Sequence, residues 1–253
     1  MKARGPFQGM LAIARFNWPF YLIAALAMIA ALAGFLAAEA ISVKAGCALI
    51  LAGAAYFFFG SLAVSHLIYD LSDLYRWSWL ARALEGSAGK RAVVSHAGFD
   101  EVSEALAAQL PDVELRILDH FLPETMTEPS VRRARRLYPP TPGTLSCPSY
   151  RWPVEPGTQD VVFGLLAIHE LRSVDERAAW FAEAKRCLKA SGRVVIAEHI
   201  RDAANFIAFG PGFLHFHSRR AWMRSWEKAD LRAVDEFRVT PWIRVFILIP
   251  SSP

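Results

Sequence analysis

The chain has 253 residues, of which 54% are apolar, and a formal net charge of +4. This length allows one large or two small domains, and the apolar fraction is high for a wholly soluble protein. The basic residues form no stripe interleaved with stacking aromatics, so nucleic acid is excluded as the expected partner. Cys47, Cys147 and Cys187 are far apart and lack metal-ligand spacing, so we expect neither a disulfide framework nor a metal site.

The apolar excess lies in two uncharged runs near the N-terminus. We expect membrane-spanning helices at about residues 17–38 and 45–69, since each run exceeds the roughly 20 residues that a spanning helix needs. The few residues between them allow only a tight turn, so residues 1–69 are predicted to form a transmembrane hairpin. A cleaved signal peptide is the alternative for the first run. That run is longer than the apolar core of a signal, however, and a second run follows directly.

Basic residues flank this hairpin on one side only. They precede the first helix and follow the second, whereas the turn between the helices holds one glutamate and one lysine. The positive-inside rule therefore predicts that both termini and the rest of the chain are cytoplasmic, with the hairpin in the inner (plasma) membrane. The net charge also suits an anionic lipid surface. The flanking residues are Lys2, Arg4 and Arg15 before the hairpin and Arg76, Arg82, Lys90 and Arg91 after it.

Three glycines, Gly46, Gly53 and Gly60, recur every seven residues in the second run. On a helix they lie close to one face, which allows near contact with a neighbouring backbone. We interpret this face as packing inside the hairpin against small residues of the first helix, or alternatively as the interface of a homodimer. His66, near the cytoplasmic end of this helix, is expected to reach interfacial water.

Residues 70–90 are predicted to form an amphipathic connector, with a helix over 70–84 and its aromatic residues near the membrane surface. From residue 91 to 253, apolar strands alternate with helices, which is typical of a parallel sheet covered by helices. The last two strands are close enough in sequence to form an antiparallel hairpin. Strands are expected over 91–95, 114–118, 144–147, 160–166, 193–197, 233–239 and 243–249, and helices over 101–109, 129–137 (strongly basic), 175–188 and 221–228.

Polar residues follow several of these strands. In a parallel, helix-covered sheet, ligands bind beyond the carboxyl ends of the strands at the topological switch point. The recurrence of histidines and carboxylates at successive strand ends therefore predicts that they line a pocket. The residues are His96-Ala97-Gly98-Phe99, Asp119-His120, His169-Glu170 and Glu198-His199.

The stretch DVVFGLLAIHELRSVDERAAWFAEAKRCLKASGRVVIAEHIRD, residues 160–202, resembles the second half of a class I S-adenosylmethionine-dependent methyltransferase. Its segment AKRCLKASGRVVIAE matches the family pattern of a helix, a glycine-assisted helix end at Ser191-Gly192 and a central strand. The resemblance covers roughly residues 91–249. It implies an α/β fold: a Rossmann-like methyltransferase sheet with helices on both faces and a C-terminal antiparallel hairpin, here preceded by the transmembrane hairpin.

The resemblance also implies S-adenosylmethionine as the cofactor and assigns residues to it. Asp119 matches the acidic residue that holds the ribose hydroxyls, and the loop after the first strand contacts the methionine part. That loop departs from the family pattern of an acid followed by alternating glycines, because only Gly98 clearly remains, so this is a member with a divergent glycine loop. The implied cofactor contacts are His96, Ala97, Gly98, Phe99, Asp119 and His120.

We expect a membrane-integrated methyltransferase that acts on a lipophilic or membrane-borne acceptor. His169 and His199 are the candidate general bases, needed only if the acceptor loses a proton, with Glu198 or Glu170 as a partner. The phenylalanine-rich segment 205–220 is interpreted as a lid or acceptor wall, or as a patch resting on the bilayer. The alternative function is a catalytically inactive protein of the same fold, serving as a cofactor sensor or membrane scaffold, which the altered glycine loop favours.

Overall fold

The computed structural model describes residues 5–87 and 89–251, and the chain divides into two compact units. The hairpin unit contains the residues up to Ser72 together with Ala203–Phe213. The sheet unit contains Asp73–Asp202 and the residues from Leu214 onward. The segment Ala203–Phe213 thus packs with the N-terminal residues, although the sequence analysis grouped it with residues 91–253. Lys2 and Arg4, two of the basic residues used to predict topology, lie outside the described residues.

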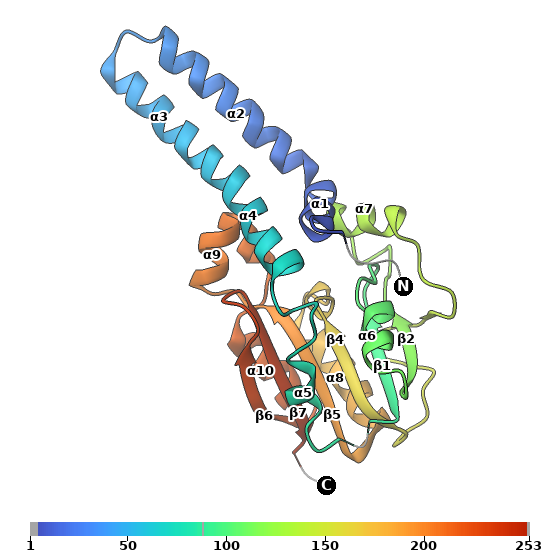
Figure 1. Ribbon diagram of the computed structural model, residues 1–253. Helices are drawn as coiled ribbons and strands as arrows, with labels where there is room; N and C mark the ends of the chain where they lie inside the picture. The colour runs from blue at the N-terminus through green and yellow to red at the C-terminus, as the bar shows by residue number, and fades with distance from the viewer. Residues whose placement is uncertain (1–4, 88, 252–253) are drawn as a thin grey trace. The chain divides into compact units, whose positions relative to one another are not determined.

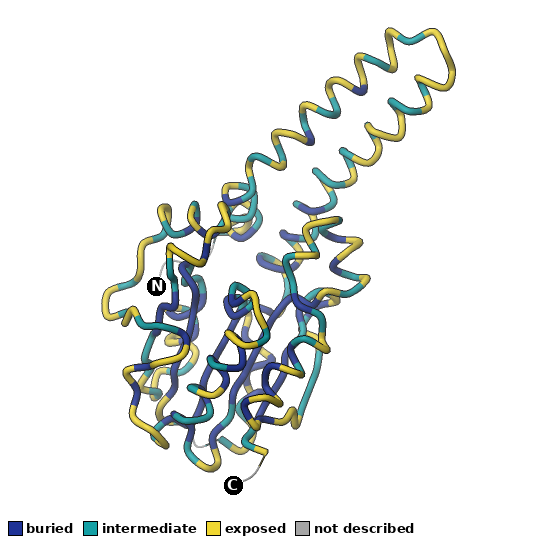
Figure 2. The backbone as a smooth tube through the Cα atoms, turned by 180° about the vertical axis from the view of Figure 1, so that it is seen from behind, coloured by how far each residue is buried: buried dark blue, intermediate teal, exposed yellow. Residues whose placement is uncertain are grey.

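The hairpin unit contains two long apolar helices, each long and apolar enough to cross a membrane by length and composition. The first is α2 (Trp18–Ala37), and the second runs without a break from Ile41 to Leu71. Most of their residues are exposed or half-buried within the chain, as Figure 2 shows. The second helix comprises α3 (Ile41–Ala55), α4 (Ser61–His66) and two π-helical turns, Tyr56–Gly60 and Leu67–Leu71; a shorter helix, α1 (Gln8–Phe16), precedes α2.

Close packing of the hairpin depends on a different glycine from the expected stripe. A Cβ atom at Gly34 of α2 would lie 2.9 Å from the Cys47 sulfur, so this glycine permits the approach of α3. A Cβ atom at Gly46 or Gly53 would meet nothing within 4 Å in the described part of the chain. The expectation that Gly46, Gly53 and Gly60 pack inside the hairpin is therefore wrong, and the homodimer through this face stays a prediction.

Asp70 joins the end of the second helix to the start of α1. Its carboxylate accepts hydrogen bonds from the backbone amides of Gly9 (2.7 Å) and Met10 (3.1 Å), which have no partner within their own helix. His66 Nδ1 lies 2.9 Å from the same carboxylate. His66 is thus bonded within the chain rather than reaching interfacial water as expected.

The connector is less regular than the sequence predicts. The chain leaves the helix at Ser72, whose ψ is 175°, and Trp77 has a positive φ of 63°. Only Leu80–Leu84 is helical there, as α5, so the expected helix over 70–84 is wrong. Trp77 and Trp79 are buried in the fold, and their packing outweighs the amphipathic pattern.

Seven strands form one sheet in the sheet unit, in the order β3-β2-β1-β4-β5-β7-β6. All neighbouring pairs are parallel except those of β7, which is antiparallel to both β5 and β6. The predicted Rossmann-like sheet with a C-terminal antiparallel hairpin is therefore confirmed. The strands are β1 (Arg91–His96), β2 (Glu114–Asp119), β3 (Leu145–Ser146), β4 (Gln159–Leu165), β5 (Leu188–His199), β6 (Leu231–Arg238) and β7 (Ile243–Pro250).

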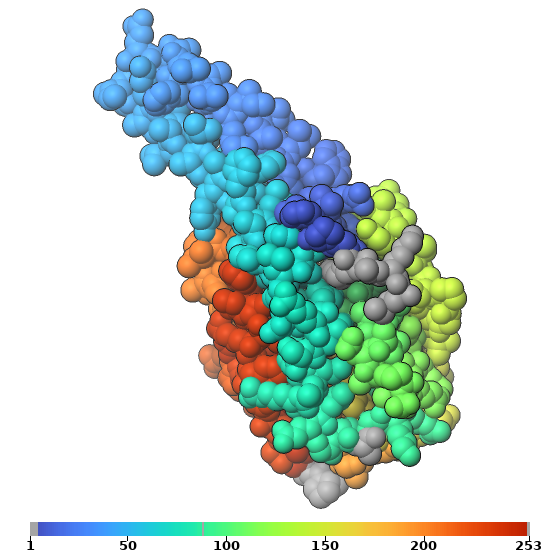
Figure 3. Space-filling model, viewed as in Figure 1, coloured from blue at the N-terminus to red at the C-terminus, as the bar shows by residue number. Residues whose placement is uncertain are grey.

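Helices cover both faces of this sheet. In the view of Figure 1, α8 and α10 lie behind the strands and α5 and α6 lie in front. The turquoise chain around α5 covers part of the near face in Figure 3. Trp180 and Phe181 of α8 and Trp222 and Trp226 of α10 are almost fully buried, so indole and phenyl rings fill the core on the far face. The remaining helices are α6 (Ser103–Gln109), α7 (Pro129–Leu137), α8 (Val174–Cys187), α9 (Ala203–Phe209) and α10 (Arg219–Glu227).

The junction between α8 and β5 differs from the expected helix stop. A capping box formed by Ser173 and Glu176 begins α8, but the helix passes into an extended Leu188 (ψ 142°) and directly into β5. Ser191-Gly192 therefore lies inside the strand and does not end the helix as expected. A Cβ atom at Gly192 would lie 3.0 Å from the backbone oxygens of Gln159 and Lys189, so a glycine is favoured at this irregular part of the strand.

Candidate active site

The loop after β4 is built around one buried carboxylate. Glu198, near the end of β5, is fully buried, and its Oε1 accepts hydrogen bonds of 2.8–3.2 Å from the three successive amides of residues 167–169. Leu166 has a φ of 55°, uncommon for a residue with a side chain, at the turn where these amides converge. Successive amides arranged in this way form an anion-binding nest. The Glu198 side chain is therefore fixed in position by the backbone.

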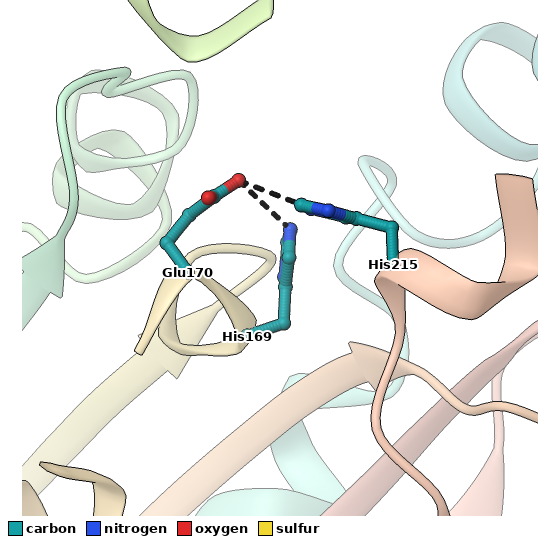
Figure 4. Close-up of side chains that lie close together, drawn as sticks. All are labelled: His169, Glu170 and His215. Atoms are coloured by element: carbon teal, nitrogen blue, oxygen red, sulfur yellow. Dashed lines mark hydrogen bonds and ion pairs between the residues drawn. The ribbon is translucent and has the colours of Figure 1, made fainter. Parts of the chain in front are cut away.

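The second oxygen of this carboxylate orients a histidine. His169 Nδ1 lies 2.6 Å from Glu198 Oε2, so the predicted partnership of these two residues is present in the structure. On the other side of the ring, His169 Nε2 is 3.4 Å from Glu170 Oε1. His215 Nε2 approaches the same Glu170 oxygen at 3.3 Å. Two imidazoles from distant parts of the chain thus converge on one carboxylate oxygen, as Figure 4 shows.

The charges in this cluster are strongly coupled. Burial lowers the pKa of His169, but the nearby carboxylates of Glu198 and Glu170 outweigh it and raise this pKa to about 10. Burial raises the pKa of Glu170, whereas its hydrogen bonds and ion pairs with His169 and His215 hold it far below the usual range. Without a ligand, His169 is therefore an imidazolium, and it must lose this proton before it can act as a general base.

Two arginines fix the segment that carries His215. Arg172 donates to the carbonyl oxygen of His215 at 2.6 Å. Arg201 donates to the carbonyl oxygens of Phe216 (2.7 Å) and Leu214 (2.6 Å). The segment is therefore attached to the loops after β4 and β5 by its backbone, which leaves the His215 imidazole free to face Glu170.

His199, the second candidate base, lies beside this cluster but not in it. Its side chain is buried, and its ring stacks on Phe216 with a centroid distance of 4.5 Å and an interplanar angle of 13°. Phe216 also meets the His169 ring edge-on at 6.1 Å. The structure therefore brings His169 and Glu198 together, while His199 packs against an aromatic ring.

At the other end of the sheet edge, Asp119 links the loops after β1 and β2. Its Oδ1 accepts hydrogen bonds from the amides of Gly98 (3.1 Å) and Phe121 (3.0 Å). Its Oδ2 pairs with Arg135 of α7 at 2.5 Å. Asp119, which the resemblance assigns to the ribose, thus lies at the end of β2 as expected. Both of its carboxylate oxygens are bonded to groups of the protein.

The glycine loop is packed beneath the chain that follows β2. Gly98 has a φ of 94°, and a Cβ atom there would lie 2.7 Å from the Phe121 ring and 3.2 Å from Val131 of α7. Ala97 is buried, and the Phe99 ring lies 5.1 Å from the ring of Tyr138. A glycine is therefore required at position 98 by the backbone conformation and by the packing of Phe121.

Two buried histidines flank Asp119. Neither ring nitrogen of His96 makes a hydrogen bond in the described chain, although Nδ1 lies 3.5 Å from Asp119. His120 Nδ1 is 2.9 Å from the carbonyl oxygen of Cys147, and its Nε2 has no hydrogen-bond partner among the described residues. Burial lowers the pKa of both histidines, that of His120 to about 4, so both are neutral near pH 7.

Three residues of these two clusters were not predicted from the sequence. Arg135 was expected only as part of a basic helix and His215 only as part of a phenylalanine-rich segment, and Phe121 was not singled out. For His215 the available signal was the pair of histidines in LHFH, which follows Gly210-Pro211-Gly212 after one phenylalanine. No local pattern indicates that Arg135 reaches Asp119, since this contact depends on how α7 packs.

Several solved methyltransferases have a similar structure. A type 11 methyltransferase from Sulfolobus solfataricus is 15% identical with a TM-score of 0.50, over 70% of this chain and 93% of that one. Mitomycin 7-O-methyltransferase is 14% identical with a TM-score of 0.56, over 98% and 74% of the two chains. A geranyl diphosphate methyltransferase in complex with S-adenosylmethionine is 17% identical with a TM-score of 0.50, over 76% and 90%.

No protein-family model and no curated protein matches the sequence. At the identities found among the solved structures, the likeness establishes the fold. The chain has the fold of the class I S-adenosylmethionine-dependent methyltransferases, as its sequence resemblance indicated.

Proposed function

We propose that the protein is an S-adenosylmethionine-dependent methyltransferase. The observation that carries the proposal is the strand order β3-β2-β1-β4-β5-β7-β6 with an antiparallel β7, together with Gly98 and Asp119 at the ends of β1 and β2. The carboxyl ends of parallel strands are where such sheets bind ligands. Both side-chain clusters described above lie at these ends, one after β1 and β2 and the other after β4 and β5.

The groups around Asp119 fit the cofactor chemically. A carboxylate accepts hydrogen bonds from ribose hydroxyls, and the unpaired nitrogens of His96 and His120 offer further polar contacts. Asp100 Oδ1 accepts hydrogen bonds from the amides of Val102 and Ser103, while its Oδ2 is buried without a partner in the described chain and suits an ammonium group. For the ribose to reach Asp119, Arg135 has to leave this carboxylate and Phe121 has to move from Gly98.

S-adenosylmethionine would supply a methyl group bonded to a sulfonium, and the acceptor atom would attack the methyl carbon in line. A bond would form between the acceptor atom and the methyl carbon as the methyl–sulfur bond breaks, and the electron pair of the broken bond would stay on the sulfur, which leaves as a thioether. Holding the two reactants in line accounts for much of the catalysis of such a step. We assign acceptor positioning to the His169–Glu170–His215 cluster, because it lies beyond β4, across the switch point from Asp119.

We propose further that the protein is membrane-integrated and that its acceptor is lipophilic or membrane-borne. The support is the hairpin of two apolar helices and the apolar α9, which belongs to the same unit and whose Ile207 carbonyl oxygen accepts a hydrogen bond from the Tyr56 hydroxyl. Phe206 and Ile207 of α9 are 51% and 62% exposed, as suits a patch resting on a bilayer. The proposed location is the inner membrane, with both termini and the sheet unit cytoplasmic.

Calorimetric titration of the detergent-purified full chain with S-adenosylmethionine tests the proposal. We expect saturable binding that Asp119→Asn abolishes and that Asp175→Asn, at an exposed aspartate paired with Lys228, leaves unchanged. Incubation of membranes with methyl-labelled cofactor should then place label in the lipid extract. An absence of binding at millimolar cofactor overturns the proposal, and extraction of the protein from membranes by alkaline carbonate overturns its membrane-integrated form.

The alternative is a catalytically inactive protein of this fold that serves as a cofactor sensor or membrane scaffold. The ion pair between Arg135 and Asp119, with Phe121 packed on Gly98, favours this alternative, because these contacts occupy the groups assigned to the cofactor. Cofactor binding without methyl transfer to any membrane extract would identify a sensor. A chain that binds no cofactor but is fully folded in its membrane would identify a scaffold.

A further inference from the structure

We propose that His169, Glu170 and His215 form a binding site for a divalent transition-metal ion, with Zn²⁺ as the best-fitting ion. One donor atom from each of these side chains lies within 4.8 Å of the donor atoms of the other two. The three side chains point toward one another in Figure 4. The cysteine and histidine spacing of the sequence gave no sign of this site, because His215 lies 45 residues after Glu170.

The distances match a tetrahedral ligand set. Zinc binds imidazole nitrogen and carboxylate oxygen at about 2.0–2.2 Å, which separates two tetrahedral ligand atoms by about 3.3–3.5 Å. The Glu170 oxygen lies 3.4 Å from His169 Nε2 and 3.3 Å from His215 Nε2. These two edges of the tetrahedron are therefore already in place, and only the separation of the two nitrogens has to adjust when the ion enters.

The surroundings of His169 support metal binding. A histidine ligand usually donates its second ring nitrogen to a carboxylate or carbonyl oxygen, which fixes the tautomer that coordinates the ion. His169 Nδ1 lies 2.6 Å from Glu198, which the amides of residues 167–169 hold in place. His215 Nδ1 lies 4.0 Å from Glu128, which is beyond hydrogen-bond distance. Each histidine therefore turns its Nε2 toward the cluster, and only His169 is held there by a hydrogen bond from its Nδ1.

The donor set selects the kind of ion. Two imidazoles and one carboxylate suit zinc and similar transition metals, whereas magnesium and calcium prefer oxygen ligands alone. Three protein ligands leave the fourth tetrahedral position open, as in catalytic zinc sites. The side chains of His169, Glu170 and His215 are 12%, 9% and 27% exposed, so the three ligand groups are largely sheltered from bulk water.

The site also narrows the acceptor class, a step that rests on the proposed methyl transfer. A hydroxyl oxygen in the open position loses its proton to solvent more readily, because a bound divalent ion stabilises the alkoxide or phenolate. That oxygen then attacks the methyl carbon, and the methyl–sulfur electron pair returns to sulfur. We therefore infer an acceptor with a hydroxyl group, such as a phenol or enol on a lipophilic body, and methylation on oxygen.

Metal binding to the tag-free full chain in detergent tests the site without reference to activity. The protein is stripped with chelator, dialysed against Zn²⁺ and then against metal-free buffer, and its metal content is measured by mass spectrometry. We expect one tightly held ion per chain, and visible absorption of tetrahedral Co²⁺ after loading with cobalt. Retention of no metal, or a cobalt spectrum typical of six oxygen ligands, overturns the proposal.

Variants locate the ion. His215→Ala and Glu170→Gln should each weaken Zn²⁺ binding by more than about 100-fold, since the loss of an outer partner alone typically costs about 10–100-fold. Glu198→Gln should weaken it by about 10–100-fold, because the glutamine amide donates to His169 Nδ1 and moves the ring proton to the coordinating nitrogen. His66→Asn is the matched control, since His66 bonds Asp70 in the hairpin unit, and it should keep one ion.

The outcomes separate this site from the proposed function. If zinc binding is unchanged in both His215→Ala and Glu170→Gln, the ion binds elsewhere and the proposed site is wrong. Circular dichroism serves to check that these variants are folded. Zinc binding without S-adenosylmethionine binding would support the metal site and contradict the proposed methyltransferase function. Cofactor binding and methyl transfer that are insensitive to chelation would support the proposed methyltransferase function and contradict a role of the ion in methyl transfer.

Discussion

The two ends of the ligand-binding edge of this sheet use the same residue types in opposite ways. Beyond β1 and β2, Asp119 is bonded to Arg135, and the neighbouring His96 is buried, neutral and without a hydrogen bond in the described chain. Beyond β4 and β5, Glu198 holds His169 in one orientation, and the other side of that ring faces Glu170 and His215. One carboxylate is occupied by an arginine, and the other orients a histidine.

The two ends differ in how far each proposed site is already formed. At the β4–β5 end, backbone amides and arginine–carbonyl bonds already hold the side chains in a convergent geometry. At the β1–β2 end, α7 would have to release Asp119 before the proposed cofactor could bind there. Four substitutions or conditions test this contrast.

Glu198→Ala should have the largest effect. It leaves three buried amides without an acceptor and His169 without its partner, so we expect a loss of about 4 kcal/mol in the free energy of unfolding. Glu198→Gln keeps an acceptor for the amides and should lose less than half as much. Denaturant unfolding monitored by tryptophan fluorescence measures both. Equal losses for the two variants would contradict the role of the amide nest.

Asp119→Asn should have the second-largest effect. We expect a loss of about 3 kcal/mol in the free energy of unfolding, because the substitution removes the charge that pairs with Arg135. The cost is smaller than at Glu198, since the Arg135 side chain is 24% exposed and can turn to water. The asparagine oxygen still accepts the two loop amides. The same unfolding measurement applies, and a neutral outcome would show that this ion pair contributes nothing to the fold.

Acidification should destabilise the β1–β2 end through its neutral histidines. His120 has a folded pKa of about 4 and an unfolded pKa near 6.5, so between these values the unfolded chain binds a proton that the folded chain excludes. Stability therefore falls as the pH drops below 6.5, by about 2 kcal/mol at pH 5 from His120 alone. His96 acts in the same direction. Thermal unfolding of the wild type and of His120→Phe between pH 5 and 7 measures how far the pH dependence of stability arises from His120. The same pH dependence in both proteins would contradict this explanation.

Arg135→Gln should have the smallest effect, and it should strengthen cofactor binding rather than weaken the protein. It frees Asp119 from its ion pair, so S-adenosylmethionine should bind about tenfold more tightly, equivalent to about 1.4 kcal/mol. Arg132→Gln is the matched control on the same helix, because Arg132 donates only to the exposed Pro123 carbonyl oxygen in the described contacts. Calorimetric titration compares them. Weaker binding in Arg135→Gln would mean that Arg135 contacts the cofactor.

The order and type of most elements in the sheet unit could be predicted from local sequence patterns. Apolar strands ending in polar residues, the helix signature before β5 and the spacing of the last two strands were sufficient to predict the sheet, its antiparallel hairpin and its similarity to methyltransferases. The two apolar runs likewise predicted two long helices, which the structure contains. These features are local, since hydrophobic periodicity depends on neighbouring residues along the chain.

The contacts between side chains of the two clusters depend on long-range packing and could not be predicted in this way. His215 joins His169 and Glu170 because Arg172 and Arg201 bind the backbone of its segment, and Arg135 reaches Asp119 because Val131 and Ala134 bury one side of α7. The buried Trp77 and Trp79 ended the expected connector helix for the same reason. Such contacts join residues far apart in sequence, and no local pattern of hydrophobicity or propensity specifies them. The strand ends thus indicated where the candidate sites lie, and long-range packing determined which residues form them.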